Sequence, residues 1–341
     1  LRVAAVASDW SAWGSALAAM AENYSRAGDE ARAEGRTASA AEQWRRAVDY
    51  FHFAQVKLTD EAEKSACQAR VRLNYEKLAG LLSPRAVPLL IPFKGAFMRG
   101  YFRMAEAGAP CVVLIGGLDS AKEVELHYFA EGFLKRGLSV FYFDGPGQGE
   151  SVGQLNLDAH FEEAVTVVLD FLSDHVKVDG FGLFGVSFGG YLACRSAAAE
   201  PRVKACVSLG GFFDSRILQR LPLPAFANLR RAFGLNENEE VERMASQITL
   251  EPLRGRMDRP LFIIHGRDDH LVDEAQVEAM SAWAGGLNEV WMMEGAEHVC
   301  TNRFGECLPV LCDWMRAQLT MAVAPQLIPS ESEGLSWHAN S

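Results

Sequence analysis

Hydrophobic residues in the N-terminal part of the chain recur at intervals of three and four, which is the period of one face of an α-helix. This pattern predicts three helices, over residues 10–28, 37–58 and 60–82. Asp60 is a suitable N-cap for the third helix, because Glu63 follows three residues later as in a capping box. No stretch of this region reads as a convincing strand, so we expect a purely helical N-terminal segment.

The second and third predicted helices resemble a helical hairpin of the tetratricopeptide type, with Trp44, Ala47 and Tyr50 on the packing faces. A free-standing stack of such hairpins needs about three or more repeats. The chain shows fewer, so we expect residues 1–83 to form a helical layer docked on the remainder. An independent binding module is the alternative interpretation.

From residue 84 onward the pattern changes from helices alone to strands that alternate with helices. Residues 89–93 and 97–104 predict two strands joined across Lys94-Gly95, a hairpin at the edge of a sheet. The later strands are continuous apolar runs, which is typical of strands buried on both faces. Strands are predicted at 111–115, 139–143, 181–186, 205–209, 261–265 and 289–293, and helices at 121–136, 158–175, 191–199, 274–284 and 305–319. The alternation predicts an α/β fold with a doubly wound, mostly parallel sheet.

The alternation is interrupted over residues 212–257, which contain Pro222, Pro224, an apolar segment at 225–233 and an acidic run at 237–242. An insertion that follows the C-terminal end of a strand is well placed to be a lid over an active site. A passive surface excursion is the alternative. The predicted organisation is therefore a helical layer (1–83), a core in two parts (84–211 and 258–322), a lid (212–257) and a loosely held tail (323–341).

Composition narrows the class of protein but does not select a substrate. The 341 residues are 49% hydrophobic and 23% charged, which describes a globular protein with an ample core, and the net charge of −11 argues against nucleic acid or an anionic membrane as partner. No apolar run has the length of a membrane span and no signal peptide opens the chain, so we expect a cytoplasmic protein. The seven cysteines lack zinc spacing and are expected to be reduced, buried thiols, with no metal or cofactor implied.

The segment with the clearest chemistry is Gly185-x-Ser187-x-Gly189, which lies between the apolar strand at 181–186 and the helix at 191–199. Strand, sharp turn and helix with a serine at the apex describe a nucleophile elbow, whose glycines let strand and helix pass closely. A structural turn of small residues is the alternative. We predict that Ser187 is a catalytic nucleophile.

A serine hydroxyl needs a neighbouring base, and in elbow enzymes an acidic residue and then a histidine follow the serine along the chain. His298, five residues after the strand at 289–293, has the right order and place. Asp268 and Asp269 follow the preceding strand, and Asp269 is favoured because its spacing matches a Gly-x-x-Asp-x-x-Val turn of such hydrolases. Asp214, after an earlier strand, is the minority alternative.

Acyl transfer also needs two backbone N–H donors for the developing oxyanion. We nominate Phe188, directly after the serine, and Leu118, in the loop that Gly116-Gly117 allows to bend tightly. The glycine-rich run at 144–151 lacks the Gly-Lys-Ser/Thr ending of a phosphate loop and is expected to pass beside the site instead.

Four residues are predicted to contact the substrate. Phe212, Phe213 and Phe226 make an aromatic neighbourhood that suits a flat apolar ligand, although core packing explains such residues equally well. Asp119, in the loop after the strand at 111–115, is the fourth.

With these residues in place, the chain resembles the α/β-hydrolase superfamily, and within it the group of 2,6-dihydroxypseudooxynicotine hydrolase and the FrsA-type esterases. The matching motifs are Gly117-Leu118-Asp119-Ser120-x-Lys122-Glu123, Phe143-Asp144-Gly145-Pro146-Gly147-Gln148-Gly149-Glu150, Gly185-x-Ser187-x-Gly189-Gly190, Glu200-Pro201-Arg202 and His298-Val299-Cys300-x-Asn302. The resemblance implies a triad of Ser187, His298 and Asp269, hydrolysis of an activated ketone or ester, and a possible homodimer.

Two departures from the family pattern matter, the first for hydrogen bonding around the oxyanion loop and the second for substrate choice. The oxyanion loop of relatives usually opens His-Gly, whereas this one opens Gly116-Gly117. Relatives that act on pyridine alkaloids carry an acidic residue shortly after the Gly-Gly-Phe at the start of the lid, and residues 217–221 contain none. Both departures leave the predicted fold and triad intact.

Four functional hypotheses remain open at this point. The leading one is a cofactor-free serine hydrolase that cleaves a C–C bond beside a carbonyl in a small aromatic or polyketide-like ketone or 1,3-diketone. The second is an ester or thioester hydrolase with the same triad. The third is a lyase or cyclase on the same fold, and the fourth is a non-catalytic protein that binds a partner through its helical layer.

Overall fold

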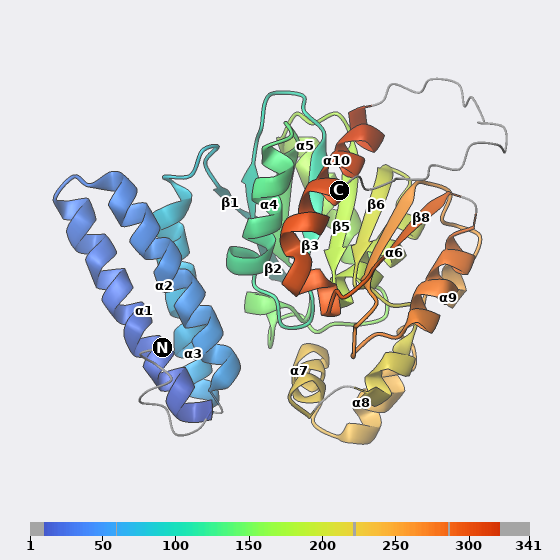
Figure 1. Cartoon of the computed structure of the whole chain (residues 1–341), viewed down its shortest axis with the longest axis horizontal. Helices are drawn as coiled ribbons and strands as arrows, with labels where there is room; N and C mark the ends of the chain where they lie inside the picture. Colours follow the sequence, from blue (N-terminus) through green and yellow to red (C-terminus); the bar gives the residue numbers. More distant parts are fainter. Residues whose placement is uncertain (1–9, 59, 221–222, 286, 321–341) are drawn as a thin grey trace, which may run out of the picture.

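The computed structural model describes residues 10–58, 60–220, 223–285 and 287–320, so the predicted tail at 323–341 lies outside the described residues. Its centre is an eight-stranded sheet with the order β1-β2-β4-β3-β5-β6-β7-β8 (Figure 1). The strands are β1 (Val87–Phe93), β2 (Ala96–Arg103), β3 (Cys111–Ile115), β4 (Ser139–Asp144), β5 (Phe181–Val186), β6 (Val203–Leu209), β7 (Leu261–Gly266) and β8 (Asn288–Met293). The strands β4, β3, β5, β6, β7 and β8 pair in parallel, as the alternation predicted.

The antiparallel part of the sheet is the hairpin β1–β2, which forms one edge. The chain reverses at Lys94 and Gly95, both in the left-handed region with φ of 43° and 82°. Every residue of β3, β4, β5 and β7 is buried, which explains why these strands are continuous apolar runs.

Helices cover both faces of the sheet. One face packs against α5 (Glu162–His175), α6 (Phe188–Ala199) and α9 (Glu274–Ala284), and the other against α4 (His127–Leu134) and α10 (Phe304–Thr320). The arrangement is the predicted doubly wound α/β fold. The helix α5 begins later than the predicted residue 158, because residues 159–161 form a turn before it.

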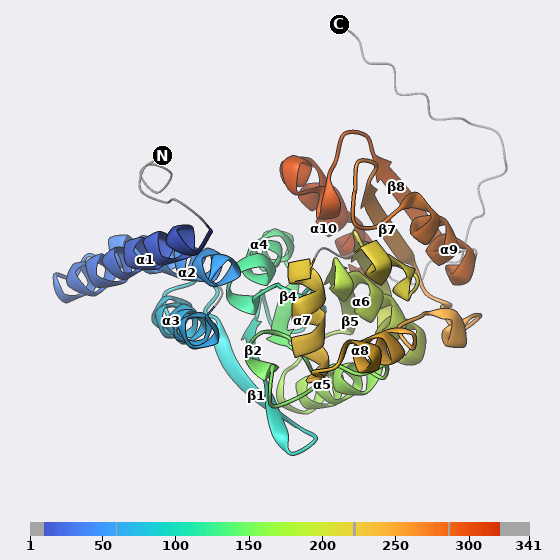
Figure 2. The ribbon, with the colours of Figure 1, turned by 90° about the horizontal axis from the view of Figure 1, so that it is seen from below.

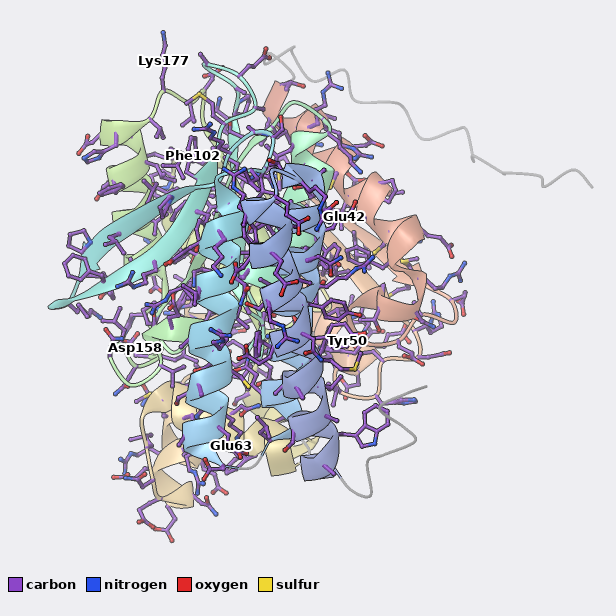
Figure 3. All side chains as sticks on the ribbon, turned by 90° about the vertical axis from the view of Figure 1, so that its left-hand side faces the viewer. Glu42, Tyr50, Glu63, Phe102, Asp158 and Lys177 are labelled. Atoms are coloured by element: carbon purple, nitrogen blue, oxygen red, sulfur yellow. The ribbon has the colours of Figure 1, made fainter. Side chains whose placement is uncertain are left out.

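The N-terminal layer consists of α1 (Trp10–Ala33), α2 (Thr37–Lys57) and α3 (Glu61–Ala79), as predicted. The Asp60 side chain accepts a hydrogen bond from the Glu63 N–H at 2.9 Å, which confirms the predicted cap. Figure 3 shows these helices side by side in front of the sheet, with the β1–β2 hairpin beside them. Their apolar faces join the same hydrophobic cluster as β3, β4, α4 and α10, so the layer is docked on the core.

Polar contacts fix this docking. The Arg45 guanidinium donates to the Glu123 carbonyl at 2.7 Å, and the His52 ring lies 2.8 Å from the Glu125 carboxylate. The buried Tyr75 hydroxyl lies 2.8 Å from both the His127 ring and the Tyr142 hydroxyl. The helical layer is therefore bound to the segment that follows β3.

That segment differs from the prediction of one helix over 121–136. It begins with a π-helical turn, η1 (Lys122–Leu126), and continues as α4. Four of the five residues in the turn are buried, including Lys122 and Glu123. An amphipathic α-helix exposes part of every turn to solvent, whereas this turn buries most of its side chains.

The segment after β6 contains the short helix η3 (Ser215–Arg220), then α7 (Leu223–Phe233), α8 (Asn238–Ala245) and η4 (Glu251–Leu253). In Figure 2, α7 crosses the end of the sheet between the helical layer and α8. Leu229 of α7 and Val241 of α8 are fully buried against the core. The segment thus packs over the end of the sheet at which β5 leads into α6.

Candidate active site

Ser187 stands at the turn between β5 and α6 with a φ of 56°, in the left-handed region that a serine rarely adopts. A Cβ on Gly185 would lie 1.9 Å from the Gly189 carbonyl oxygen, and a Cβ on Gly189 would lie 2.3 Å from the Ile115 carbonyl oxygen. Only glycine fits at either position. The geometry is that of the predicted elbow.

The Ser187 hydroxyl takes part in a continuous chain of hydrogen bonds. Its Oγ lies 2.8 Å from the His298 Nε2, and the His298 Nδ1 lies 2.7 Å from the Asp269 Oδ2. The other Asp269 oxygen accepts the backbone N–H groups of Leu271 and Val272 at 2.8 and 3.0 Å. Hydroxyl, imidazole and carboxylate are thereby aligned as a nucleophile, a base and an orienting acid require.

Burial by itself raises the pKa of Asp269, whose side chain is only 1% exposed. The hydrogen bond and positive charge of His298, with the two backbone donors, outweigh burial and hold this pKa below its ordinary value. An ionised Asp269 is suited to fix the His298 tautomer and to stabilise an imidazolium.

The alternative acids lie elsewhere. Asp214 bonds to the Arg216 side chain and to the Gln276 amide, and Asp268 is exposed to solvent. Of the three aspartates predicted as candidates, the structure therefore brings only Asp269 to His298.

The loop that carries His298 is held by a residue to which the sequence analysis gave no role. Asn302 accepts the Glu297 N–H at 2.9 Å and donates to the Gly295 carbonyl at 2.8 Å, which closes the loop on itself. Directly after the histidine, Val299 and Cys300 have φ values of 51° and 55°. This conformation is strained for a β-branched residue, and strain of this kind gathers at functional sites.

The loop after β3 passes directly beside the serine. A Cβ on Gly117 would lie 3.1 Å from the Ser187 Cβ, so the next amide, that of Leu118, is close to the nucleophile. In the part of the chain that the structure describes, neither the Leu118 nor the Phe188 backbone N–H donates a hydrogen bond to a protein acceptor. Both predicted oxyanion donors are thus left available to a ligand.

Gln148 connects this loop to the glycine-rich segment after β4. The buried Gln148 amide donates to the Gly116 carbonyl at 2.6 Å and accepts the Gly145 N–H at 3.1 Å. The glycine-rich run was predicted only to pass beside the site. In the structure, the Gln148 side chain of this run also holds the backbone at Gly116, two residues before Leu118.

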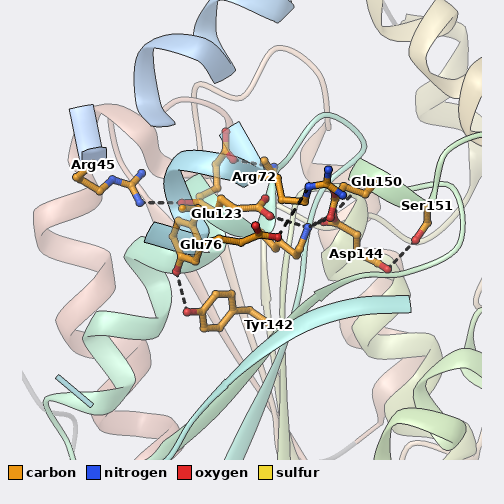
Figure 4. Close-up of polar contacts among 12 residues, drawn as sticks. Arg45, Arg72, Glu76, Glu123, Tyr142, Asp144, Glu150 and Ser151 are labelled. Atoms are coloured by element: carbon orange, nitrogen blue, oxygen red, sulfur yellow. Dashed lines mark hydrogen bonds and ion pairs between the residues drawn. The ribbon is translucent and has the colours of Figure 1, made fainter. Parts of the chain in front are cut away.

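A second link between the two segments is a buried ionic cluster (Figure 4). The Lys122 ammonium lies 2.7 Å from both Glu123 and Asp144 and 2.9 Å from Glu150. Burial lowers the pKa of Lys122, but the three negative charges outweigh it and hold this pKa well above its ordinary value. Burial raises the pKa of Glu123 to about 7 despite the Lys122 charge. These ion pairs account for the charged residues of the motifs at 117–123 and 143–150.

A cavity of about 550 Å³ adjoins the oxyanion loop. The helical layer contributes Val56 and Gln68 to its lining, the loop after β3 contributes Leu118 and Asp119, and α7 contributes Asn228. Ser187 and His298 are not among its lining residues, but Leu118 and Asp119 directly follow Gly117, which lies against Ser187.

The three phenylalanines predicted to contact substrate do not line this cavity. Phe212 and Phe213 are buried in the core, where the Phe212 ring stacks on Tyr191 at 5.1 Å and meets Phe188 edge-on at 5.2 Å. Phe226 is partly buried against the same cluster. The structure brings Asp119 to the cavity, and substrate contact by the phenylalanines stays a prediction.

No group of histidine, cysteine and acidic side chains that could hold a metal ion occurs among the described residues. All seven cysteines are buried and unpaired by disulfides. Within the described ranges, no helix is both long enough and apolar enough to cross a membrane.

Comparisons with known proteins identify the family of this chain. A family model described as "Esterase FrsA-like" matches residues 13–236. The chain is 31% identical over 303 residues to 2,6-dihydropseudooxynicotine hydrolase of Paenarthrobacter nicotinovorans, covering 87% of this chain and 82% of that protein. It is 32% identical over 237 residues to 20-hydroxy-prefusarin hydrolase FUS2 of Gibberella moniliformis, of which it spans 56%.

Solved structures give the same result. The crystal structure of 2,6-dihydroxy-pseudo-oxynicotine hydrolase matches with a TM-score of 0.84 and 27% identity, over 91% of this chain and 89% of that one. AbyA5 matches with a TM-score of 0.73 over 88% of each chain, at 16% identity, and shows the shared fold alone.

Proposed function

This chain belongs to the FrsA-like esterase family and is a hydrolase of the α/β-hydrolase fold, and from that premise we propose that Ser187, His298 and Asp269 form its catalytic triad. The observation that carries the proposal is the unbroken hydrogen-bond chain from the Ser187 hydroxyl through His298 to the buried Asp269. We assign the oxyanion hole to the backbone N–H groups of Leu118 and Phe188, which flank the serine and have no protein acceptor among the described residues.

In this proposal His298 takes the Ser187 proton as the oxygen attacks the substrate carbonyl, and Asp269 stabilises the resulting imidazolium. The tetrahedral oxyanion accepts the Leu118 and Phe188 N–H groups. Collapse breaks the bond to the leaving group, which receives the proton from His298 and departs, leaving an acyl-enzyme. Water, deprotonated by His298, then releases the acid and restores the serine. Nucleophile, base, acid and oxyanion donors all come from the chain, so no step calls for a cofactor.

The leaving group distinguishes the two candidate reactions. An ester releases an alkoxide, whereas cleavage of a C–C bond releases a carbanion that must be delocalised or protonated as it forms. Residues 217–221 contain no acid that could act as a second proton donor beside His298, so we expect the substrate itself to delocalise the charge. An acyl-aromatic ketone or 1,3-diketone does so, because its leaving fragment departs as an enolate or a phenol-stabilised anion.

We therefore infer an aromatic or polyketide-like ketone as substrate. Two relatives support this choice by their names, one a 2,6-dihydropseudooxynicotine hydrolase and one a 20-hydroxy-prefusarin hydrolase. The second candidate, ester or thioester hydrolysis with the same triad, is favoured by the family description.

The test is a matched substrate panel. Acyl-phloroglucinols and aryl 1,3-diketones are incubated beside aryl esters and thioesters of equal size, and both fragments are followed by mass spectrometry. The proposal expects two fragments from at least one ketone, and none from the Ser187→Ala variant. Turnover confined to esters or thioesters, with every ketone intact, assigns the enzyme to the second reaction.

A further inference from the structure

Four carboxylates line the cavity beside the oxyanion loop: Asp119, Glu123, Asp144 and Glu150. Lys122 lies within ion-pair distance of the last three, which form the cluster of Figure 4. Three of the four carboxylates therefore share one buried ammonium and have a structural role.

Asp119 differs from the other three. Among the described residues it takes part in no ion pair, and its one polar contact is a hydrogen bond from the Asn228 amide of α7. It is exposed to solvent and lies on the wall of the cavity beside the oxyanion loop. Burial and the negative charge of Glu125 raise the pKa of Asp119 above its ordinary value, although the Asn228 hydrogen bond lowers it. A carboxylate has about four acceptor positions, so one amide leaves most of them unfilled.

Asp119 is also close to the nucleophile along the backbone. Gly117 abuts Ser187, and Asp119 is two residues further on. Consecutive Cα atoms are about 3.8 Å apart, so the Cα atoms of Gly117 and Asp119 are separated by at most about 7.6 Å. A ring whose carbonyl lies at Ser187 can thus place a substituent against Asp119.

We propose that Asp119 determines specificity by accepting a hydrogen bond from a hydroxyl or protonated amine of the substrate, so that this enzyme selects ring-hydroxylated ketones over their unsubstituted or O-methylated counterparts. The inference rests on the proposed function, because it places the scissile carbonyl at Ser187. Asn228 holds Asp119 from the side of α7, and the apolar cavity walls, such as Val56 and Leu118, receive the ring. A site built to accept a hydrogen bond from the substrate binds analogues that lack the donor less tightly, because the contact with the charged carboxylate is then lost.

The experiment measures protection of Ser187 from a fluorophosphonate, which needs no turnover. The rate of labelling is followed by mass spectrometry with rising concentrations of 2,4,6-trihydroxyacetophenone, acetophenone or 2,4,6-trimethoxyacetophenone. The hydroxylated ketone should halve the rate at a concentration at least about tenfold lower than either counterpart, as expected for loss of one hydrogen bond to a charged group. In Asp119→Ala the three ketones should protect within about threefold of one another.

Two further variants complete the design. Asp119→Asn has nearly the same shape and keeps an acceptor for Asn228, so it replaces the alanine variant if that one fails to fold. Asp174→Asn removes an exposed carboxylate from α5 and should leave the tenfold preference unchanged.

The outcomes separate the two proposals. Equal protection by all three ketones, protection by none, or a preference that persists in both Asp119 variants overturns the assignment of Asp119. Labelling at a residue other than Ser187 overturns the proposed function instead.

Discussion

Replacing Gln148 with leucine tests whether the link between the two glycine-containing loops serves the oxyanion hole. The substitution keeps a side chain of similar size but removes the hydrogen bonds to the Gly116 carbonyl at 2.6 Å and from the Gly145 N–H at 3.1 Å. Each buried backbone group left unpaired costs about 1–3 kcal/mol, so the two together cost about 2–6 kcal/mol of stability.

The catalytic effect follows from the position of Gly116, two residues before the proposed donor Leu118. Oxyanion donors must lie about 2.7–3.1 Å from the oxygen, and losing one costs about 10²–10³ in kcat. Releasing the loop displaces one donor without deleting it, so we expect kcat to fall about 10- to 100-fold. KM should change less than about threefold, because the oxyanion forms only after the substrate has bound.

The assay is steady-state hydrolysis of p-nitrophenyl acetate, beside urea unfolding of the same preparations. Gln276→Leu is the matched control, because this buried amide also bonds to the backbone, at Phe213 and Asp214, away from the oxyanion loop. It should lose comparable stability and keep most of its kcat. If Gln148→Leu loses stability but turns over as the control does, Gln148 has only a structural role and the reasoning is refuted.

Three further predictions follow from the site. Asp269→Asn should lower kcat by about four orders of magnitude, whereas Asp268→Asn and Asp214→Asn should each cost less than tenfold; a comparable loss at Asp214 would move the acid to the earlier strand. Cys300→Ser should retain most turnover, because this thiol is buried and its hydrogen bond with a neighbouring cysteine and burial both raise its pKa. Glu123→Gln should stabilise the protein by about 1–3 kcal/mol at pH 8 and by little near pH 4.5 in urea unfolding. The folded Glu123 has a pKa of about 7 against an ordinary 4.5, so it holds a proton that the unfolded chain has released, and stability falls as the pH rises between these values; equal effects at both pH values would contradict this.

Local patterns were sufficient to predict most of the fold. Apolar runs marked the buried strands β3, β4, β5 and β7, and the intervals of three and four marked α1 to α3. The elbow was also predictable, because a Cβ added at Gly185 or Gly189 would lie less than 2.5 Å from a backbone oxygen, so only glycine fits at this spacing.

The π-helical turn was not predictable from periodicity. Charged residues at the start of a helix normally indicate solvent, but Lys122 and Glu123 are buried because Asp144 and Glu150 meet them from a segment more than twenty residues away. Charge compensation between distant segments leaves no periodic signal in the sequence.

The lining of the cavity was likewise not predictable from the sequence. Its walls come from α2, α3, the loop after β3, the glycine-rich segment after β4 and α7, so its lining depends on how these elements pack together. Aromatic residues after β6 are compatible with a pocket and with a core, and the packing of Phe212 on Tyr191 distinguishes the two only in three dimensions. Motifs therefore indicated the chemistry proposed at Ser187 but not the cavity beside it.

The most direct test of the proposed function is the site of covalent modification by a fluorophosphonate, mapped by peptide mass spectrometry. The hydrogen-bond chain from Ser187 through His298 to Asp269 predicts a single adduct on Ser187, no labelling of Ser187→Ala, and labelling slowed by orders of magnitude in His298→Ala. An adduct on another residue, or undiminished labelling of Ser187→Ala, would contradict the assignment of Ser187 as the nucleophile.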